Sequence, residues 1–382
     1  MVVETDSEHP QPVIDAATPG ETVRFDSSVQ YTLEESLVVT TPGLTLEGLN
    51  LRLADGADED LIEVGADDIE ISGFSLDGNR ENQPGERQSN GILVTGATQV
   101  LIGKGQITAV SRHGVRIVDS SVGTSTAPED TIHVDRGPVS DITVRDVRVD
   151  RPRRDGCSVE GPDLQGAVVE NVRTFGSSDR GCIEVKDGAI DVYVGNCYAE
   201  DCVYGVAVQD HGKYPTANLR IVNNAAVGCE TLVDAQTSHP PADVIVTGNS
   251  GRDLGGDGMG GPGGIHVNRI KGLVVADNVI HGIDGPGIAV NDCEEVSVNG
   301  NVVRDVEGPG IMCRGDARGT TDIILSNNRS AGGIELSGVV NHYLVTGNLL
   351  GAPIVDKAEG AGLLTDNLTK NDCSNPSTAS KL

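Results

Sequence analysis

A repeat of 23 residues constrains this chain more than any other feature. Four tetrapeptides begin with glycine and alternate apolar with variable residues, and their glycines are 23 residues apart: Gly264-Ile265-His266-Val267, Gly287-Ile288-Ala289-Val290, Gly310-Ile311-Met312-Cys313 and Gly333-Ile334-Glu335-Leu336. The same pattern occurs earlier, at Gly91-Ile92-Leu93-Val94, Gly114-Val115-Arg116-Ile117, Gly156-Cys157-Ser158-Val159 and Gly205-Val206-Ala207-Val208. A fixed period of this length indicates one small structural unit stacked many times along the chain.

A second element recurs between the tetrapeptides. It is a short run of alternating apolar residues followed by Asn, at spacings of 19 to 29 residues: Asn171, Asn196, Asn224, Asn249, Asn278, Asn301, Asn328, Asn348 and Asn367. Period-two alternation with Gly, Asn and Asp between the runs predicts short β-strands joined by tight turns. Leucine-rich repeats have a similar period but require a regular Leu lattice, and propeller blades need about 40 residues. The pattern therefore predicts a parallel β-solenoid.

The predicted fold is all-β, a single-stranded parallel β-helix of about 12 coils. We expect an N-terminal cap and first turn over residues 1–43, the β-helix over 44–369, and a flexible C-terminal tail over 370–382. Inward side chains should stack on their equivalents about 4.8 Å away in the next coil. The recurrent Asn is expected at a turn, where its amide bonds to neighbouring coils and its backbone adopts the left-handed conformation.

These repeats resemble the right-handed parallel β-helix of the pectin-lyase-like superfamily, which includes polygalacturonases and tailspikes. The opening stretch Gly20-Glu21-Thr22-Val23-Arg24-Phe25 and the segment Leu76-Asp77-Gly78-Asn79-Arg80 also resemble that superfamily. The resemblance covers about residues 13–370 and implies the fold. Activity does not follow from it, because the same fold serves lyases, hydrolases, epimerases and viral tailspikes.

Charge excludes some functions. The 382 residues carry 28 basic and 57 acidic side chains, a formal charge of −29. Such a surface repels phosphate backbones, so nucleic-acid binding is not expected. Asp and Arg predominate, at 35 Asp to 22 Glu and 21 Arg to 7 Lys, which resembles the proteins of extreme halophiles or their viruses. Molar salt screens the self-repulsion of such a surface. No apolar run approaches 18 residues, so membrane insertion is not expected.

The eight cysteines form no Cys-x-x-Cys pair, so a zinc ribbon or redox motif is not predicted. Cys157, Cys182 and Cys313 occupy apolar positions of the repeat, where a thiol behaves as a small hydrophobic group. A disulfide of Cys197 with Cys202 or Cys229 stays open at this point, since spacing does not choose the pairing.

Two segments carry a sharper resemblance, to polygalacturonase-type hydrolases. Arg153-Arg154-Asp155-Gly156 is similar to that family's Asn-Thr-Asp-Gly, and the segment 179–186 resembles its aspartate pair before Cys-Ile-x-Ile-Lys. In that family carboxylates share the acid and base work on a glycosidic bond. By this resemblance Asp155 matches the motif Asp, but Arg180 and Gly181 stand where the family has its aspartate pair, and Asp179 is one position out of register. Our hypothesis for the catalytic residues is therefore a rearranged acid and base set of Asp155, Asp179 and Glu184.

Sugar-binding residues are expected in the same part of the chain. Equivalent positions of successive coils line one groove, and long insertions near 119–139, 209–217, 235–242 and 252–264 would form its walls. In a lyase or C5-epimerase, cations neutralise the uronate carboxylate while a base removes the adjacent proton. No cofactor is predicted; the acidic stretch Asp253 to Asp257 is a candidate for Ca²⁺, without regular ligand spacing. The candidate substrate-binding residues are Lys186, Tyr204, Asp210, His211, His266 and Arg269.

Three functions stay open. The preferred one is a glycan-directed surface protein, a virion spike or a capsid or tail decoration that binds host polysaccharide. No signal peptide is visible, which suits a virion protein and an extracellular or virion-surface location. The alternative is a carbohydrate-active enzyme, a hydrolase, lyase or epimerase acting on acidic polysaccharide. A third is a structural scaffold without a sugar ligand. A long flat side favours a homo-oligomer, such as a trimer.

Overall fold

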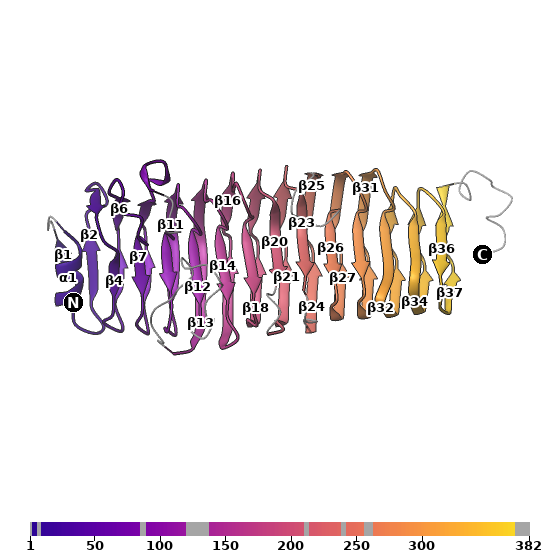
Figure 1. The fold of residues 1–382 in the computed structure, drawn as a ribbon, viewed down its shortest axis with the longest axis horizontal. Coiled ribbons are helices and arrows are strands. Elements are labelled where there is room, and N and C mark those ends of the chain that lie inside the picture. The colour runs from indigo at the N-terminus through magenta and orange to yellow at the C-terminus, as the bar shows by residue number, and fades with distance from the viewer. Residues whose placement is uncertain are drawn as a thin grey trace. The chain divides into compact units, whose positions relative to one another are not determined.

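The computed structural model describes residues 2–5, 9–84, 89–119, 137–209, 214–237, 242–255 and 263–370. The chain divides into two compact units, Met1–Cys202 and Val203–Leu382. Figure 1 shows the strands of each unit as side-by-side arrows, and their pairings are parallel. The insertions expected to form groove walls lie mostly outside the described residues, as does the predicted tail after Lys370.

In the first unit, three strand stacks build the helix. The first stack contains β4 (Leu37–Val39), β7 (Ile62–Val64), β10 (Ile92–Val94), β12 (Val115–Val118), β14 (Cys157–Glu160) and β17 (Ile183–Lys186). The second contains β1 (Val2–Thr5), β2 (Thr22–Phe25), β5 (Thr45–Glu47), β8 (Glu70–Ser72), β15 (Leu164–Glu170), β18 (Ile190–Gly195) and the first parts of β11 (Leu101–Thr108) and β13 (Val139–Asp150). The third contains β3 (Tyr31–Leu33), β6 (Asn50–Leu53), β9 (Ser75–Asp77), β16 (Arg173–Phe175), β19 (Tyr198–Glu200) and the last parts of β11 and β13.

The second unit repeats this arrangement. Its first stack contains β20 (Tyr204–Gln209), β23 (Thr231–Gln236), β26 (Ile265–Asn268), β29 (Ile288–Asn291), β36 (Ile354–Ala358) and the first parts of β32 (Ile311–Ser326) and β34 (Ile334–Thr346). Its second contains β21 (Ala217–Val222), β24 (Ala242–Thr247), β27 (Lys271–Ala276), β30 (Glu294–Asn299), β37 (Gly362–Thr365) and the last parts of β32 and β34. Its third contains β22 (Ala225–Val227), β25 (Ser250–Leu254), β28 (Val279–Ile283), β31 (Val302–Val306), β33 (Arg329–Ser330), β35 (Leu349–Leu350) and β38 (Leu368–Thr369).

The repeat glycines have a steric cause. In seven of the eight predicted tetrapeptides a first-stack strand starts at the residue after the glycine, as β12 and β29 show; β20 starts one residue before Gly205. A Cβ on Gly114 would lie 2.6 Å from the carbonyl oxygen of Gly156 in the next coil, and one on Gly287 would lie 2.3 Å from Val303. No larger residue fits at these two glycines unless the neighbours move.

The third stack was not predicted. Two strand types per repeat were expected from the sequence, but a third, short strand follows the second-stack strand of each coil. Strands of two to five residues, such as β33 and β28, are too short to produce a readable period-two pattern. Inward Val, Ile, Leu and Ala side chains of all three stacks form the buried core.

The position of the recurrent Asn was predicted incorrectly in part. In the second unit the buried Asn is not left-handed; the residue before it is, with φ of 55° at Asp277 and 68° at Gly300. In the first unit Asn171 and Asn196 are themselves left-handed, and Val172 and Cys197 follow them into the core. Period alone did not distinguish the two positions, which are adjacent in sequence.

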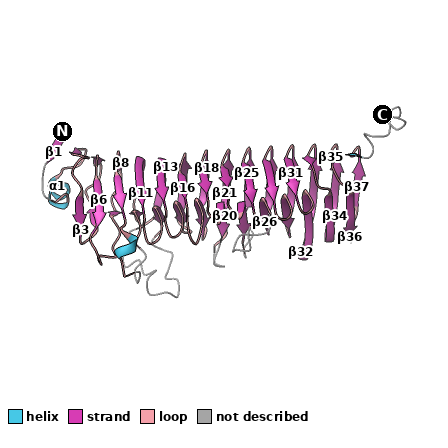
Figure 2. Cartoon of the chain, turned by 90° about the horizontal axis from the view of Figure 1, so that it is seen from above, coloured by secondary structure: helices cyan, strands magenta, loops and turns pink. Residues whose placement is uncertain are grey.

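Two short helices complete the first unit, coloured cyan in Figure 2: α1 (Gln11–Ala16) and the 3₁₀-helix η1 (Arg80–Asn82). The side-chain amide of Gln11 binds the backbone of Val38, accepting from its N–H at 2.8 Å and donating to its carbonyl at 2.9 Å. This pairing satisfies backbone groups of β4, the first strand of the first stack.

Cysteines are confirmed as buried small groups. Cys157, Cys182, Cys197, Cys202, Cys229, Cys293 and Cys313 are all buried free thiols, while Cys373 lies outside the described residues. None of the disulfides left open by sequence analysis is present among these seven cysteines. Burial raises the pKa of the Cys293 thiol to about 12, so it stays protonated and unreactive at neutral pH.

Candidate functional site

Charged side chains occupy the outward face of three first-stack strands in the first unit. The strand register aligns Arg116 with Ser158 and Glu184 across β12, β14 and β17. Two residues further on, it aligns Glu160 with Lys186. Outward positions of a β-helix normally face water, yet these charged side chains are buried. We call Arg116, Glu160, Glu184 and Lys186 the first-stack cluster.

Ion pairs compensate the buried charges of this cluster. Lys186 Nζ lies 2.8 Å from Glu184 Oε2 and 3.2 Å from Glu160 Oε2. Arg116 binds the other carboxylate oxygen of Glu160, and the Ser158 hydroxyl donates to Glu184 at 3.2 Å. Each carboxylate therefore has a cation beside it, which a buried charge requires.

Protonation in the cluster is shifted toward the charged forms. Burial alone would raise the pKa of Glu160, but Arg116 and Lys186 outweigh it and hold that pKa well below its usual value. Burial opposes the ionised form of Glu184 too, and Lys186 overcomes it, so the pKa of Glu184 is also lowered. The same carboxylates raise the pKa of Lys186 against its desolvation. At neutral pH the two carboxylates are therefore negatively charged and Lys186 is positively charged.

A buried histidine and aspartate adjoin the cluster. His113 and Asp155 are both 0% exposed, and Nδ1 of His113 lies 3.1 Å from Oδ2 of Asp155. The backbone N–H of Asp155 donates to Nδ1 of His113 at 3.4 Å, so Nδ1 is the acceptor nitrogen and we place the imidazole proton on Nε2. Burial, together with the nearby Arg112, Lys186 and Arg116, lowers the pKa of His113 well below its usual value. The imidazole is therefore neutral at physiological pH.

His113 and Asp155 belong to a polar column. The backbone N–H of Asn90 donates to Oδ1 of Asp60 at 2.6 Å, and that of His113 to Oδ1 of Asn90 at 3.3 Å. One coil further on, Gly181 N–H donates to Oδ1 of Asp155 at 3.2 Å. We call Asp60, Asn90, His113 and Asp155 the mixed column. Its side chains link successive coils at the turn before the first stack.

A metal ion does not suit this region. His113, Asp155 and Glu184 each offer a ligand atom, and these atoms lie within 4.8 Å of one another. However, the cations that lower the pKa of His113 would oppose a dication at the same place, and Glu184 is already bound to Lys186. The residues of this region therefore do not fit a metal ion.

The structure brings together only part of the predicted catalytic set. Asp155, Glu184 and the predicted ligand Lys186 lie in this one buried region. Asp179 is separate: its carboxylate is half-exposed and pairs with Arg153 Nε at 2.9 Å. Register explains the difference, because Asp179 lies in the turn before β17, whereas Glu184 lies on that strand.

A second polar group lies on the first stack of the second unit. Asp234 on β23 aligns with His266 on β26, and Asp234 Oδ1 is 3.1 Å from Nδ1 of His266. Nε2 of His266 is 3.1 Å from the side-chain nitrogen of Asn291, and Gln236 donates to both oxygens of Asp234. The side chains of Asp234 and His266 are 1% and 8% exposed. We call Asp234, His266 and Asn291 the histidine site.

This arrangement orients the imidazole of His266 as a base. With its proton on Nδ1 and directed to Asp234, Nε2 carries the lone pair and accepts from the Asn291 amide. Asn291 Oδ1 and Arg269 Nε are buried and have no hydrogen-bond partner among the described residues. Arg269 directly follows β26 and has a left-handed backbone conformation, φ 61°. A ligand with both a donor and an acceptor could satisfy these two atoms.

Tyr204, another predicted substrate-binding residue, lies on β20 and is 1% exposed. A sugar would therefore reach it only after its neighbours move. Asp210 and His211 lie outside the described residues, as does Asp257 of the candidate Ca²⁺ stretch. At the other end of that stretch, Asp253 lies 3.4 Å from Arg252 Nε.

Asp234 and the role of Asn291 were not predicted from the sequence. The coil at β23 has Leu232 where other coils have the repeat glycine, so the tetrapeptide pattern passed over it. Aligning the variable third position of every coil would have placed Asp234 beside His266, as the strand register does.

Comparisons with known proteins agree with this geometry. A family described as "right handed beta helix region" matches residues 233–350. The A-module of mannuronan C-5 epimerase AlgE6 from Azotobacter vinelandii is 16% identical, with 94% of this chain and 93% of that chain covered and a TM-score of 0.65. The N-terminal fragment of bacteriophage phi29 gene product 12 is also 16% identical, covers 91% and 67%, and has a TM-score of 0.72.

The surface adhesin PfbA of Streptococcus pneumoniae is 14% identical, with 94% and 85% of the two chains covered and a TM-score of 0.55. No curated protein matches the sequence. The predicted right-handed parallel β-helix is confirmed. At these identities the likeness establishes the fold and leaves the activity to the residues of this chain.

Proposed function

We propose that this protein is a glycan-directed β-helix surface protein, on a virion or in the extracellular space, that binds polysaccharide. One observation carries the proposal over a hydrolase. The carboxylates expected to cleave a glycosidic bond are already engaged: Glu184 with Lys186, Asp155 with the backbone N–H of Gly181 and Asp179 with Arg153. A hydrolase needs one carboxyl group free to donate a proton across an open cleft.

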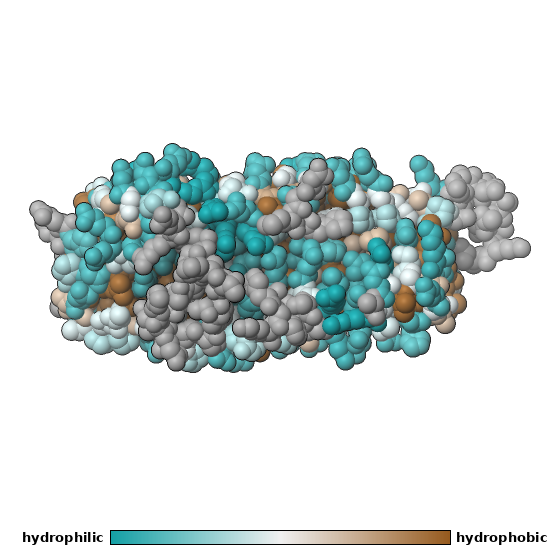
Figure 3. Space-filling view, in the orientation of Figure 1, coloured by the Kyte–Doolittle hydropathy of each residue, from teal (hydrophilic) through white to brown (hydrophobic). Residues whose placement is uncertain are grey.

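Surface polarity and the structural neighbours support binding. On the face shown in Figure 3, hydrophilic residues predominate in both units. The neighbours include a protein named as a surface adhesin and a bacteriophage gene product. Among the described residues, no helix is long and apolar enough to cross a membrane.

A second function, proton abstraction from an acidic sugar, is favoured by the histidine site. Asp234 holds the imidazole of His266 with Nε2 as the basic atom, and Arg269 follows three residues later. A lyase or C5-epimerase needs such a base together with a cation for the uronate carboxylate. The epimerase among the structural neighbours has the same fold.

One experiment separates the two functions. The purified protein, in molar potassium chloride, is incubated with neutral, uronate and sulfated polysaccharides; bound sugar is measured and products are analysed by mass spectrometry. Binding without product is expected. Products that disappear in His266→Gln but persist in His281→Gln, an exposed histidine of the same unit, would replace binding by catalysis. Neither binding nor product would leave the scaffold function.

Halophilic origin and self-association complete the proposal. The charge of −29 predicts a melting temperature that rises between dilute buffer and molar salt, and equal melting in both would refute a halophilic origin. The last coil of the second unit exposes Leu363, Leu364 and Leu368, which supports a homo-oligomer. Light scattering at molar salt would show a single monomer mass if that is wrong.

A further inference from the structure

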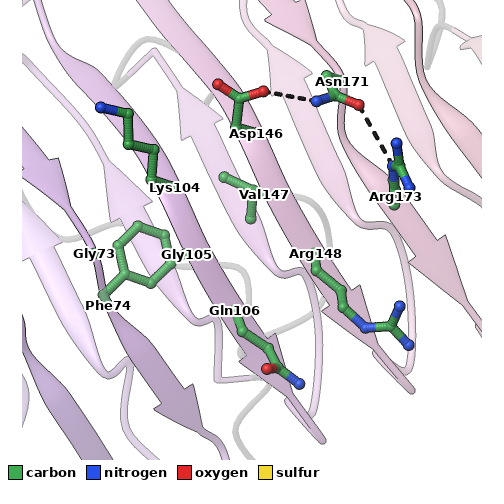
Figure 4. Close-up of a pocket in the computed structure, with 10 residues that line it drawn as sticks. All are labelled: Gly73, Phe74, Lys104, Gly105, Gln106, Asp146, Val147, Arg148, Asn171 and Arg173. Atoms are coloured by element: carbon green, nitrogen blue, oxygen red, sulfur yellow. Dashed lines mark hydrogen bonds between the residues drawn. The ribbon is translucent and has the colours of Figure 1, made fainter. Parts of the chain in front are cut away.

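A pocket lies at a corner of the first unit, away from the first-stack cluster. It has a volume of about 420 Å³ and lies where the second stack passes into the third. Phe74, Gly105 and Val147 form its inner side, and Lys104, Arg148 and Arg173 are among its outer residues. Figure 4 shows Lys104 and Arg173 on opposite sides of the pocket, with Val147 between them and Phe74 on the side of Lys104.

The inner side of the pocket is packed around a glycine. The register aligns the corner residues Phe74, Gly105 and Val147 in successive coils. Gly105 leaves the column without a side chain, and the Phe74 ring fills the space on the inner side: a Cβ on Gly105 would lie 2.2 Å from it. The shape of the pocket is therefore determined by the packing of strand residues and does not depend on a mobile loop.

Three basic side chains line the pocket, although the chain as a whole is acidic. Arg148 is held by Asp150 at 2.6 and 2.7 Å and stacks over Phe175 with its guanidinium carbon 4.0 Å from the ring centroid. Lys104 and Arg173 form no ion pair with any of the described residues. Asp146 bonds to Asn171, whose oxygen accepts from Arg173 at 3.4 Å. Two cations thus remain available to a ligand.

We propose that this corner pocket binds an anionic oligosaccharide, which lies across the stack with one acid group at Lys104 and another at Arg173. The inference rests on the proposed glycan binding and names a subsite and a ligand class for it. Lys104 and Arg173 stand two coils apart, about 10 Å along the stack. The apolar inner side suits the C–H face of a sugar, and the cations pair with carboxylate or sulfate groups.

The net charge of the protein bears on which sugars the corner pocket can bind. At −29 the protein as a whole repels acidic polymers, so a local cationic pocket is needed to hold one. Molar salt shortens the reach of this repulsion to about 3 Å while direct pairs inside the pocket persist in weakened form. The pocket should therefore discriminate acidic from neutral sugars.

A charge-removal pair tests the inference. Lys104→Met with Arg173→Met is compared with Arg220→Met with Arg329→Met, which removes the same charge from exposed positions of the second unit. Binding of oligouronate, sulfated and neutral oligosaccharides is measured by calorimetry, with melting temperatures as a folding check. The pocket variant should lose affinity for acidic sugars about tenfold, with the control unchanged.

The outcomes separate this inference from the proposed function. Equal affinity of wild type and pocket variant for acidic sugars, or binding of neutral sugars only, overturns the pocket while glycan binding stands. A wild-type protein that binds no sugar overturns both. Loss confined to oligouronates identifies carboxylate as the acid group, and loss confined to sulfated sugars identifies sulfate; either result supports the pocket.

Discussion

Both units contain a column of polar side chains, most of them buried, that ties coil to coil, but the columns differ in chemistry. In the second unit the column is uniform: seven Asn residues, Asn224, Asn249, Asn278, Asn301, Asn328, Asn348 and Asn367. In the first unit the mixed column holds Asp60, Asn90, His113 and Asp155 at a different corner. At the corner equivalent to the Asn column, the first unit has apolar residues such as Val172 and Cys197.

A uniform Asn column stabilises the fold because its side-chain amides hydrogen-bond to one another from coil to coil. Asn278 accepts from the backbone and side chain of Asn249 at 2.9 and 3.0 Å, and donates to Asn301 at 2.9 Å and Val246 at 3.0 Å. Each amide therefore completes the next one, and a buried polar group costs little when fully bonded. A mixed column cannot repeat this pattern; it carries charge and shifted pKa values, which are typical of functional sites.

The largest expected effect lies in the first-stack cluster. Lys186→Met leaves the buried Glu184 without its cation and Glu160 with only Arg116, so we expect unfolding free energy to fall by about 4 kcal/mol. Chemical denaturation at fixed molar salt measures the loss. Adding Glu184→Gln removes the orphaned charge and should restore part of it. A loss below about 1 kcal/mol would mean that the cluster is solvated and that its burial is not a constraint.

A slightly smaller effect tests the Asn column. Asn278→Gly removes four buried hydrogen bonds and leaves donors of Asn249 without an acceptor, which should cost about 3 kcal/mol. The matched control is Asn196→Gly, because Asn196 is exposed and left-handed at φ 55°, a conformation that suits glycine. We expect the control to stay within about 0.5 kcal/mol of wild type in thermal and chemical unfolding. If both variants lost the same unfolding free energy, Asn196 and Asn278 would be equivalent positions of one repeat, as the sequence suggested.

That pair of residues shows where prediction from sequence stops. The 23-residue period was enough for the parallel β-helix, because glycine at a close backbone approach and alternating Val and Ile leave few other folds. Period did not reveal that Asn196 and Asn278 differ by one position, since a turn residue and a buried column residue are neighbours in sequence. A one-residue shift reverses which side chain faces inward, and only the register resolves it.

The candidate site was predictable to a similar degree. Asp155, Glu184 and Lys186 lie together because they occupy turn and strand positions of adjacent coils, which spacing could indicate. Their burial and mutual neutralisation depend on side-chain contacts that no spacing encodes. Asp234 was missed because its coil lacks the repeat glycine, although strand register pairs it with His266.

A modest, pH-dependent effect is expected at the start of the mixed column. Desolvation raises the pKa of Asp60 to about 6, above its usual value of about 3.8. Between these values the folded state holds a proton that the unfolded state has lost, so the carboxyl destabilises the fold at pH 7.5 and the penalty fades as pH falls toward 4. Asp60 is half-buried, so we discount the shift to roughly 1–2 kcal/mol.

Asp60→Asn therefore should stabilise the first unit at pH 7.5 and make no difference near pH 4. The substituted amide oxygen can still accept from Asn90, so the hydrogen bonds of the column persist. Unfolding free energies of both proteins across this pH range, at constant salt, give the comparison. A gain of the same size at every pH would show that the raised pKa is not its source.

The smallest expected effect concerns Asp179, the predicted catalytic residue outside the cluster. Its pair with Arg153 spans 2.9 Å between half-exposed side chains, a situation in which ion pairs contribute little. Arg153→Ala should change unfolding free energy by less than about 1 kcal/mol, and Asp179→Asn should leave bound sugar unchanged. If Asp179→Asn instead abolished binding or turnover while Glu184→Gln did not, the functional surface would follow the exposed turn before β17 and the buried cluster would be purely structural.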